Sequence, residues 1–370
     1  MPKKKSQKVT LNSVLKKKID KLLQTGFNNE VFAAAEVLVA QHGEVVAHAK
    51  VGQVYKASRF DLSSLTKPLV VSSLFLQLAA KRVVTLDQPV SDFLRTKTLK
   101  KITIQDLLEH RSGLVAWASF LPRQLQAKRT SFANNKKKIL YDILHNEKYI
   151  IGKKQGETVY SDLGYIVLGA ILEKITRKKL LLQFRKMIKQ PLGLNQTLAY
   201  QPLSHKTLPI QSHMVPSGIC RVRQRLLQGE VQDDNAYVMG GVSGHAGLFG
   251  NALAIHQILQ QWRLAKTKES VIFPKASFQI LNKGLKVPLK NRHRFICGFD
   301  TVDAKSPNFG TGFNRRATLC HLGYSGVSFA WDLSKDLWVI LLTNRGMFGA
   351  DNPKIYDFRT NLHNMVLQEF

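Results

Sequence analysis

Acidic residues are scarce in this sequence. The 370 residues include 25 Asp and Glu against 55 Lys and Arg, which gives a formal net charge of +30. A basic excess is typical of nucleic-acid-binding proteins, but these gather their basic residues on one face with aromatic residues among them. Here the basic groups are short and dispersed: Lys16–Lys18, Lys136–Lys138, Lys153–Lys154, Arg177–Lys179, and Arg221, Arg223 and Arg225. This spacing favours a solvated basic surface over a nucleic-acid site.

Cysteine is scarce as well, and common metal and nucleotide motifs are missing. Cys220, Cys297 and Cys320 are an odd number, lie far apart and form no CxxC pair. Neither a disulfide framework nor a zinc site is therefore expected. The 11 histidines form no HxH or HExxH pattern, and the chain has no GxxxxGK[ST] or GxGxxG motif. We expect no metal and no cofactor.

Long apolar runs are absent too. A membrane-spanning helix needs about 20 apolar residues, whereas the apolar stretch from Pro68 to Ala80 is shorter and contains two serines and a glutamine. The lysine-rich start of the chain is not followed by the apolar segment of a signal peptide. The lysines at the start of the chain predict a basic tail at residues 1–9. The missing apolar segments predict no membrane span and a cytoplasmic location. The few cysteines fit that reducing compartment.

Hydrophobic residues make up 44% of the chain, which is ordinary for a folded protein. Their spacing predicts a first helix that carries Leu11, Val14, Leu15, Ile19, Leu22 and Leu23 on one face. Residues 34–51 alternate around His42-Gly43, which predicts a hairpin of two strands. Residues 64–227 are mostly helical in pattern, for example at 103–110 and 162–174. Strands are predicted at 328–331 and 337–343, before a final helix with Ile355, Phe358, Leu362 and Met365.

Strands at both ends of the chain around a helical middle predict an α+β fold. One antiparallel sheet, flanked by the terminal helices, would be built from residues 10–80 and 240–370. Residues 81–239 would form a mostly helical insert lobe.

Ser64 and Lys67 are the first candidate site residues. Three residues apart on a helix, they lie on one face, one turn from each other. A lysine whose pKa is lowered by burial can take the proton of a serine hydroxyl and so activate it as a nucleophile. Because Pro68 is tolerated only near a helix start, the helix is expected to begin close to Ser64, with the serine N–H facing a bound oxyanion. Ser63 is the competing nucleophile, but its third neighbour, Thr66, is no base.

Tyr160-Ser161-Asp162 is the second candidate segment, on a loop that enters a helix. Its tyrosine could share the proton transfers of Ser64 and Lys67. The alternative interpretation is structural, with Asp162 as the helix N-cap and Tyr160 as a partly buried core residue.

The third segment is His321-Leu322-Gly323-Tyr324, just before the last strands. Gly323 leaves room for a substrate to approach the backbone. A lone histidine is more often structural, and His321 gains interest from its place beside the other two motifs.

Weaker signals lie between these motifs. The acidic cluster at residues 229–235 is expected to be a solvated loop tied to the glycine-rich segment 240–249, with a substrate or ion contact as the alternative. Within the glycine-rich segment, His245 is a candidate substrate contact. Residues 241–245 miss the GxSxG nucleophile motif at their last position.

The three motifs together resemble the serine β-lactamase and penicillin-binding-protein superfamily, on its class C and esterase side. Two flanking segments are similar to that superfamily as well: residues 102–114, ITIQDLLEHRSGL, and the glycine-rich residues 240–249. The resemblance runs from about Val37 to Asn344 and implies a β-lactamase/transpeptidase-like fold.

The resemblance also implies a role for each matching residue. Ser64 would be the acylated nucleophile, with Lys67 and Tyr160 as the proton-transfer pair. His321 would stand where many relatives carry the lysine of a KTG motif. The backbone N–H groups of Ser64 and Tyr324 would form the oxyanion hole, and the reaction would be acyl transfer in two steps. The expected substrate contacts are Asp162, His245 and Gly323.

Two positions depart from the family pattern. Asp162 replaces the asparagine of the commonest Tyr-x-Asn motif, which exchanges an amide donor for a carboxylate that only accepts when ionised. That carboxylate could pair with Lys67 and change its pKa. Leu322 replaces a frequent threonine or serine and removes one hydroxyl from the site wall.

We therefore expect a serine hydrolase that acts on a small ester, amide or peptide, as an esterase, an amidase or a D-amino-acid peptidase. Peptidoglycan-derived substrates are among the candidates. Two alternatives stay open. One is β-lactamase or penicillin-binding activity, which the missing export signal disfavours. The other is a non-catalytic protein that binds anions or nucleic acid on the same fold, which the intact Ser64, Lys67 and Tyr160 disfavour.

Overall fold

A computed structural model of the chain describes residues 12–121, 131–151, 157–203, 213–302, 308–349 and 352–370. The predicted basic tail, Leu11 and the Lys153–Lys154 pair lie outside these residues. Within them, every helix is too short or too polar to cross a bilayer.

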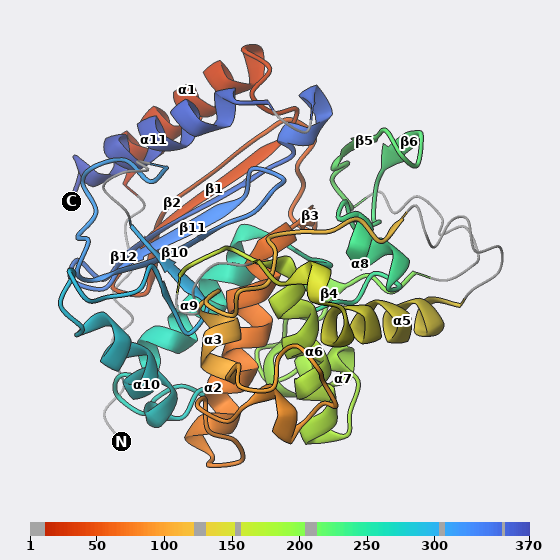
Figure 1. Ribbon diagram of the computed structural model, residues 1–370. Helices are drawn as coiled ribbons and strands as arrows, with labels where there is room; N and C mark the ends of the chain where they lie inside the picture. The colour runs from red at the N-terminus through yellow and green to blue at the C-terminus, as the bar shows by residue number, and fades with distance from the viewer. Residues whose placement is uncertain (1–11, 122–130, 152–156, 204–212, 303–307, 350–351) are drawn as a thin grey trace.

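Both ends of the chain contribute to one seven-stranded sheet (Figure 1). Its order is β2 (Glu44–Val51), β1 (Ala35–Gln41), β12 (Leu337–Thr343), β11 (Ser328–Asp332), β10 (Thr318–Leu322), β9 (Phe299–Thr301) and β8 (Phe295–Ile296). Every neighbouring pair in this sheet is antiparallel. Strand β1 pairs with its hairpin partner β2 and with β12, where Ala35 lies opposite Thr343. The predicted α+β fold, the hairpin at 34–51 and the last two strands are confirmed.

The two faces of the sheet pack into separate cores because successive side chains of a strand point to opposite sides. On one face, Val37 and Val39 of β1 pack with α1 (Ser13–Asn28) and α11 (Lys354–Leu367), which lie side by side over the sheet (Figure 1). On the other face, Leu38 and Ala40 belong to a larger core that includes α9 (Ala252–Leu264) and α10 (Lys275–Leu285). The sheet thus has the terminal helices on one face and α9 and α10 on the other.

The first helix differs from its prediction at one position. Leu15, Ile19 and Leu23, spaced by four residues, are buried against the sheet, but Val14 is 57% exposed. The helix begins at Ser13, after the Asn12 cap, and its buried face consists of residues at every fourth position from Leu15. Val14 lies beside that face and is turned to solvent.

The middle of the chain is mostly helical, as predicted. Its main elements are α2 (Ser73–Ala80), α3 (Ile104–Leu108), α5 (Phe132–His145), α6 (Asp162–Thr176), α7 (Leu180–Phe184) and α8 (Asp234–Val238), with π-helical turns η2 (Lys67–Ser72) and η5 (Arg185–Lys189) and 3₁₀ turns η3 (Val90–Asp92) and η4 (Glu147–Tyr149). Helix α6 is buried on every side from Leu163 to Leu172, because α3, α5 and α7 pack around it. The sequence predicted one buried face for this helix, and the structure gives it a central position. The lobe boundaries at residues 81 and 240 stay predictions.

Short strands in and next to this middle region escaped prediction. A three-stranded sheet joins β3 (Phe60–Asp61), β7 (Leu248–Gly250) and β4 (Leu198–Tyr200), and a separate hairpin consists of β5 (Gly218–Cys220) and β6 (Arg225–Leu227). Two- and three-residue strands are too short to show an alternating pattern. The β3–β7 pair matters for function, because it sets the glycine-rich segment beside the residues that lead to Ser64.

Candidate active site

Ser64 lies in the tight 3₁₀ turn η1 (Ser63–Leu65), between β3 and η2. The backbone of the preceding Ser63 has a positive φ of 47°, which is uncommon for a residue with a side chain. That conformation is held because the Ser63 N–H donates to Asp61 Oδ1 at 2.8 Å. The Ser63 hydroxyl donates to Ser325 Oγ at 3.0 Å. The competing nucleophile is therefore tied to the loop after β10, and Ser64 is the serine that Lys67 contacts.

The helix that follows Ser64 begins where the sequence predicted, but not as an α-helix. Residues 67–72 form the π-helical turn η2, with Pro68 in its first turn, and regular α-helix starts only at Ser73. Proline lacks the N–H that an α-helical hydrogen bond would need at its position. The first turns of this helix therefore take other hydrogen-bond patterns around the candidate nucleophile.

Lys67 is fully buried beneath Ser64. Its Nζ donates to Ser64 Oγ at 2.9 Å and to the backbone carbonyl of His245 at 3.1 Å, and it lies 2.7 Å from Asp162 Oδ1. Burial alone would lower the pKa of Lys67, but the charges and hydrogen bonds of Asp162 and Tyr160 outweigh burial, so the pKa is raised. Lys67 is thus an ammonium group in the resting site, paired with Asp162 as the departure from Tyr-x-Asn suggested.

Tyr160 and Asp162 enter the site from the start of α6. The Tyr160 ring centre lies 4.9 Å from Lys67 Nζ. Burial raises the pKa of the phenol, although the Lys67 charge acts in the opposite direction, so Tyr160 is neutral at neutral pH. The interpretation of Asp162 as the helix N-cap is wrong, because Ser161 caps α6 by accepting from the Gly164 N–H. Asp162 is the first helical residue, and its carboxylate pairs with Lys67 instead of capping the helix.

His110 fixes the turn that carries Tyr160, and sequence reasoning did not single it out. Its ring centre lies 4.4 Å from that of Tyr160. Its Nδ1 accepts from the Ser161 N–H at 2.9 Å, and its carbonyl accepts from the Val159 N–H at 2.9 Å. Burial, followed by the Lys67 charge, lowers the pKa of His110 well below the usual range, so the neutral ring is available as an acceptor. His110 lies within the ITIQDLLEHRSGL segment, which was the only sequence signal for it.

His321 is the last residue but one of β10, and its ring faces the same site. Its Nδ1 lies 2.8 Å from the Leu322 carbonyl, which can only accept, so Nδ1 carries the proton and Nε2 is left as an acceptor. Burial and then the Lys67 charge lower the pKa of His321 to about 3. The ring is therefore neutral, with its centre 6.1 Å from that of Tyr160.

Gly323 allows β10 to approach the nucleophile turn. A Cβ on this residue would lie 2.4 Å from Val327 Cγ2 and 3.1 Å from the Leu62 carbonyl. The next residue, Tyr324, is half exposed, and its carbonyl accepts from Arg345 Nε at 2.7 Å. The close approach sets Gly323 against Leu62 and Ser63, next to Ser64 in the chain. The oxyanion hole of Ser64 and Tyr324 stays a prediction.

His245 is placed in the site, but its ring is fully engaged. Its Nδ1 lies 2.8 Å from Ser243 Oγ and its Nε2 lies 2.7 Å from Asp233 Oδ1. Burial would raise the pKa of Asp233, but the His245 charge and hydrogen bond outweigh it and lower the pKa to about 2. The part of His245 that contacts another site residue is its carbonyl, which accepts from Lys67.

The acidic cluster at 229–235 is tied to the glycine-rich segment through this Asp233–His245 pair, as expected. It is not a solvated loop, because Glu230, Val231 and Asn235 are buried. The Gln232 N–H donates to Asp61 Oδ2 at 2.7 Å, so one buried carboxylate joins this segment to the turn of Ser64. Sequence reasoning missed Asp61, whose two oxygens accept from a neighbouring backbone amide, that of Ser63, and from a distant one, that of Gln232.

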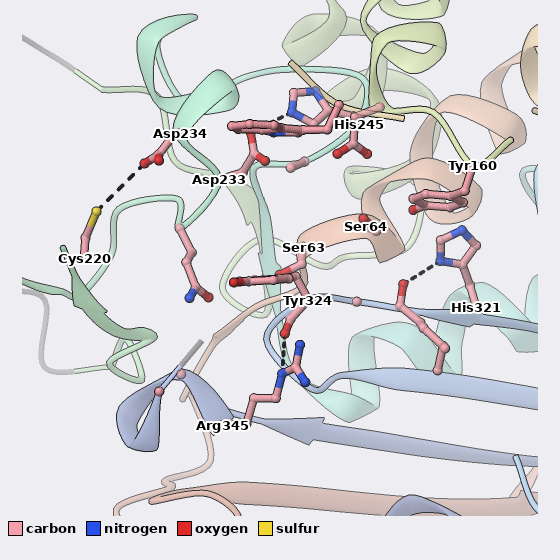
Figure 2. A pocket seen from close by; sticks show the side chains of 18 of the residues that line it. Ser63, Ser64, Tyr160, Cys220, Asp233, Asp234, His245, His321, Tyr324 and Arg345 are labelled. Atoms are coloured by element: carbon pink, nitrogen blue, oxygen red, sulfur yellow. Dashed lines mark hydrogen bonds and ion pairs between the residues drawn. The ribbon is translucent and has the colours of Figure 1, made fainter. Parts of the chain in front are cut away.

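A cleft of about 880 Å³ opens over these residues (Figure 2). Its lining includes most of the predicted site residues: Ser64, Tyr160, Asp162, His245, His321, Gly323 and Tyr324. Lys67 lies below, under Ser64. Other parts of the wall, from the β5–β6 hairpin and from the segment after β12, were not predicted. Among the residues that the structure describes, no three His, Cys, Asp or Glu side chains are grouped to hold a metal ion, and all three cysteines are free.

Comparisons with known proteins agree with this fold. The family model described as "Beta-lactamase" matches residues 18–362. The N-acetylmuramyl-L-alanine amidase of Bacillus subtilis is 28% identical, over 88% of this chain and 81% of its own. A putative D-alanyl-D-alanine carboxypeptidase of Salmonella agona is 26% identical, over 80% of this chain and 71% of its own. The octameric penicillin-binding protein homologue from Pyrococcus abyssi shares the fold, with a TM-score of 0.69 and 19% identity over 94% of this chain and 77% of that one.

Proposed function

The chain belongs to the beta-lactamase family of serine hydrolases, and on that premise we propose that it cleaves an amide bond in a peptidoglycan-derived peptide through an acyl-enzyme on Ser64. The two curated relatives support the substrate class, since their names describe an amidase for N-acetylmuramyl-L-alanine and a carboxypeptidase for D-alanyl-D-alanine. The observation that carries the role of Ser64 is the 2.9 Å contact between its Oγ and the buried Lys67 Nζ.

Proton transfer in this site has to start from a charged lysine. Because Lys67 is an ammonium group in the resting site, it cannot accept a proton until it gives one away. Asp162 lies 2.7 Å from Lys67 Nζ and can receive that proton. We assign Asp162 this role: as Ser64 Oγ attacks the carbonyl carbon, the serine proton moves to Lys67 and a lysine proton moves to Asp162.

The remaining steps follow from the same groups. The N–H groups of Ser64 and Tyr324 would stabilise the oxyanion of the tetrahedral intermediate. The C–N bond then breaks, and the amine leaves with a proton supplied through Tyr160 and Lys67. Water adds to the acyl-enzyme by the reverse proton path, which releases the acid and restores the Ser64 hydroxyl. His321, neutral and with Nε2 as an acceptor, would receive a hydrogen bond from the substrate.

Covalent labelling tests the proposal. The protein is incubated with a fluorophosphonate and, separately, with labelled penicillin, and the adduct is measured by intact-protein mass spectrometry. We expect one adduct that Ser64→Ala abolishes. Ser63→Ala is the matched control, because that neighbouring hydroxyl is bound to Ser325 and its loss should leave labelling in place.

Two results would overturn the assignment of Ser64: no adduct with either probe, or an adduct that persists in Ser64→Ala. Release of D-alanine from N-acetyl-D-alanyl-D-alanine, followed by chromatography, tests the substrate class. If the protein is labelled at Ser64 but cleaves only simple esters, the peptidoglycan assignment fails and the esterase interpretation replaces it.

A further inference from the structure

Exposed apolar side chains gather on the β5–β6 hairpin, which lies at the periphery of the molecule (Figure 1). Ile219 is 67% exposed, Leu226 is 45% exposed, and Val222 in the turn between the strands is exposed as well. Ile219 of β5 lies directly opposite Leu226 of β6, so the two side chains form a cross-strand pair on one face. Neighbouring aliphatic side chains that are left in water are typical of a surface that contacts another body.

The 3₁₀ turn η6 (Arg345–Phe348) extends this apolar face. Strand β5 packs on η6, and the approach is close, since a Cβ on Gly218 would lie 2.5 Å from the Gly346 carbonyl oxygen. Phe348, at the end of η6, is exposed and lines a second hollow of about 320 Å³ together with Arg221 of the hairpin. Two segments far apart in the sequence therefore join their apolar side chains on one surface.

The same surface is basic. The hairpin from Gly218 to Leu227 contains three arginines and no acidic residue. Arg223 is turned inward to Glu230 and Asp234. Arg221 is exposed and forms no ion pair within the part of the chain that the structure describes. Arg225 pairs with Glu230, yet half of its side chain is exposed.

The second hollow adds one cation and one acid to this surface, Lys354 and Glu30. The Lys354 Nζ donates to the Asn29 carbonyl at 2.9 Å, so a neutral group and not the acid holds it. With Arg221 beside them, the charge of the hollow stays positive. An occupant of this surface would therefore meet apolar side chains and an excess of positive charge.

The apolar side chains extend beyond the catalytic cleft. Ile219 and Val222 line that cleft, but Leu226 and Phe348 do not. A small substrate held over Ser64 would therefore cover only part of them. A second copy of the chain would bring two sets of arginines together, and like charges repel. An anionic lipid surface fits both properties, since it takes apolar side chains into its interfacial region and attracts basic residues to its headgroups.

We propose that this surface docks on a membrane that contains anionic lipids. The surface, which we call the mouth surface, consists of Ile219, Arg221, Val222, Arg225, Leu226 and Phe348. Its aliphatic and aromatic side chains enter the headgroup boundary, and its guanidinium groups contact lipid phosphates. Every helix of the described residues is too short or too polar to span a bilayer, and this docking needs none. Because Ile219 and Val222 belong both to the mouth surface and to the cleft wall, docking turns the open side of the cleft toward the lipid.

Vesicle binding tests the mouth surface. The full-length protein is mixed at low salt with vesicles of equimolar phosphatidylglycerol and phosphatidylcholine or of phosphatidylcholine alone, and the bound fraction is measured by sedimentation. We expect at least about tenfold tighter binding to the anionic vesicles. Leu226→Ser and Phe348→Ser should each weaken binding by about tenfold, because each removes one large apolar side chain from the lipid. Arg221→Gln should weaken it by about fivefold, the effect of one basic residue near an anionic membrane.

Val271→Ser and Lys283→Gln are the matched controls. Val271 is 68% exposed and lies between α9 and α10, and Lys283 is an exposed residue of α10. Neither lines the cleft or the second hollow, so both variants should bind as the wild type does. An equal loss in these controls would show a general effect of net charge or hydrophobicity and overturn the proposal. Failure of the wild type to bind anionic vesicles would overturn it too, as would unchanged binding by Leu226→Ser and Phe348→Ser.

Two further measurements distinguish the other occupants of this surface. Sedimentation velocity without vesicles detects self-association, and a dimer that Leu226→Ser converts to a monomer would assign the surface to a second copy and overturn the docking. Hydrolysis of 4-nitrophenyl butyrate without vesicles should be the same for Leu226→Ser as for the wild type, because Leu226 lies outside the cleft lining. A fall in its kcat/KM with unchanged vesicle binding would assign Leu226 to the substrate instead.

The docking does not depend on the proposed function. Ser64→Ala protein should bind anionic vesicles as tightly as the wild type, since Ser64 is not part of the mouth surface. Failure of covalent labelling at Ser64 would overturn the proposed function and leave the vesicle result standing. Loss of vesicle binding in Ser64→Ala would show that binding runs through the catalytic site and would overturn the docking.

Discussion

At the scale of single residues, Asp162 controls the charge of the candidate base. Its carboxylate, 2.7 Å from Lys67 Nζ, opposes burial and raises the pKa of the lysine. Without that carboxylate, burial would be free to lower the pKa. The same residue is the proposed acceptor of the lysine proton, so one side chain sets both the resting state and the first step.

Asp162→Asn should therefore change the pH dependence of the reaction. In the variant no carboxylate receives the lysine proton, so Lys67 must be neutral before it can accept the serine proton, and the rising limb of kcat/KM against pH should move to higher pH by about one unit or more. The plateau should fall by about 10- to 100-fold because the proton acceptor is lost. The position of the rising limb and the height of the plateau are both measured with one ester substrate between about pH 5 and 10.

Asp234→Asn is the matched control for that measurement. Asp234 also lines the cleft, but it pairs with Arg223 and not with Lys67. Its variant should keep the wild-type position of the rising limb. An unchanged limb in Asp162→Asn would show that Asp162 does not set the lysine charge.

The sequence predicted the local part of this site and missed the part made by distant contacts. Ser64 and Lys67 are one helical turn apart, so their contact follows from spacing alone. Asp61 and His110 act through partners far along the chain, and no spacing rule brings those partners together. Arg359, a buried arginine that lines the cleft, did leave a signal: it lies four residues after Ile355 and three before Leu362, on the predicted apolar face of the last helix. A charged residue on a buried face was the observation to follow.

At the scale of elements, Arg223 ties the β5–β6 hairpin to the segment that follows it. Arg223 is almost fully buried and donates to the carbonyls of Val231 and Gln232 at 2.9 and 2.6 Å. It also pairs with Glu230 and Asp234 at 2.5 and 3.1 Å. The basic group at 221–225, predicted to be uniformly solvated, is therefore split between this buried anchor and its exposed neighbours.

Arg223→Gln should loosen the hairpin and weaken substrate binding. The hairpin contributes Ile219 and Val222 to the cleft wall, away from Ser64. We expect KM to rise by about tenfold with a smaller change in kcat. The hairpin contacts the substrate equally in the ground state and in the transition state, so the loss of these contacts weakens binding and not the chemical step. Breaking a buried ion pair also costs about 3 kcal/mol of stability, which thermal unfolding would report.

Arg225→Gln is the control on the same hairpin. Arg225 pairs with the other oxygen of Glu230, but half of its side chain is exposed, so its loss should change KM and stability little. If both variants raise KM equally, the hairpin is not anchored by Arg223 in particular.

At the same scale, the sequence located long strands and helices better than short ones. The strand at 337–343 was predicted with the bounds it has, because seven buried residues give a clear signal. The β5–β6 hairpin has three residues in each strand and is rich in arginine, so neither alternation nor apolar content marks it. Its position is fixed by tertiary contacts of Arg223 that local propensity does not contain.

At the scale of the whole molecule, the net charge of +30 gives the protein a long-range attraction for anions. This attraction is screened by salt, over a distance of about 10 Å at 0.1 M. A substrate with a free carboxylate should feel it on approach, whereas a neutral substrate should not. The charge that first suggested nucleic acid can thus serve a small acidic substrate.

Salt dependence measures that effect. Between 20 and 500 mM NaCl, which spans roughly 20 to 4 Å of screening length, kcat/KM for the acidic substrate N-acetyl-D-alanyl-D-alanine should fall several-fold. The value for its neutral C-terminal amide should stay nearly constant over the same range. If kcat/KM falls equally for the acidic and the neutral substrate, salt acts on the fold or on the chemical step and not on the encounter of enzyme and substrate.

The pairing of β1 with β12 has a consequence for the order in which the molecule can fold. The side chain of Asn344 accepts the N–H of Ala34 at 2.7 Å, across 310 residues of sequence. During synthesis, β1 therefore waits with one edge unpaired until β12 has left the ribosome. The helical middle, whose contacts are closer in sequence, can form first. Completion of the sheet then brings Gly323 against the turn of Ser64, so the candidate site is assembled only when the last strands have been made.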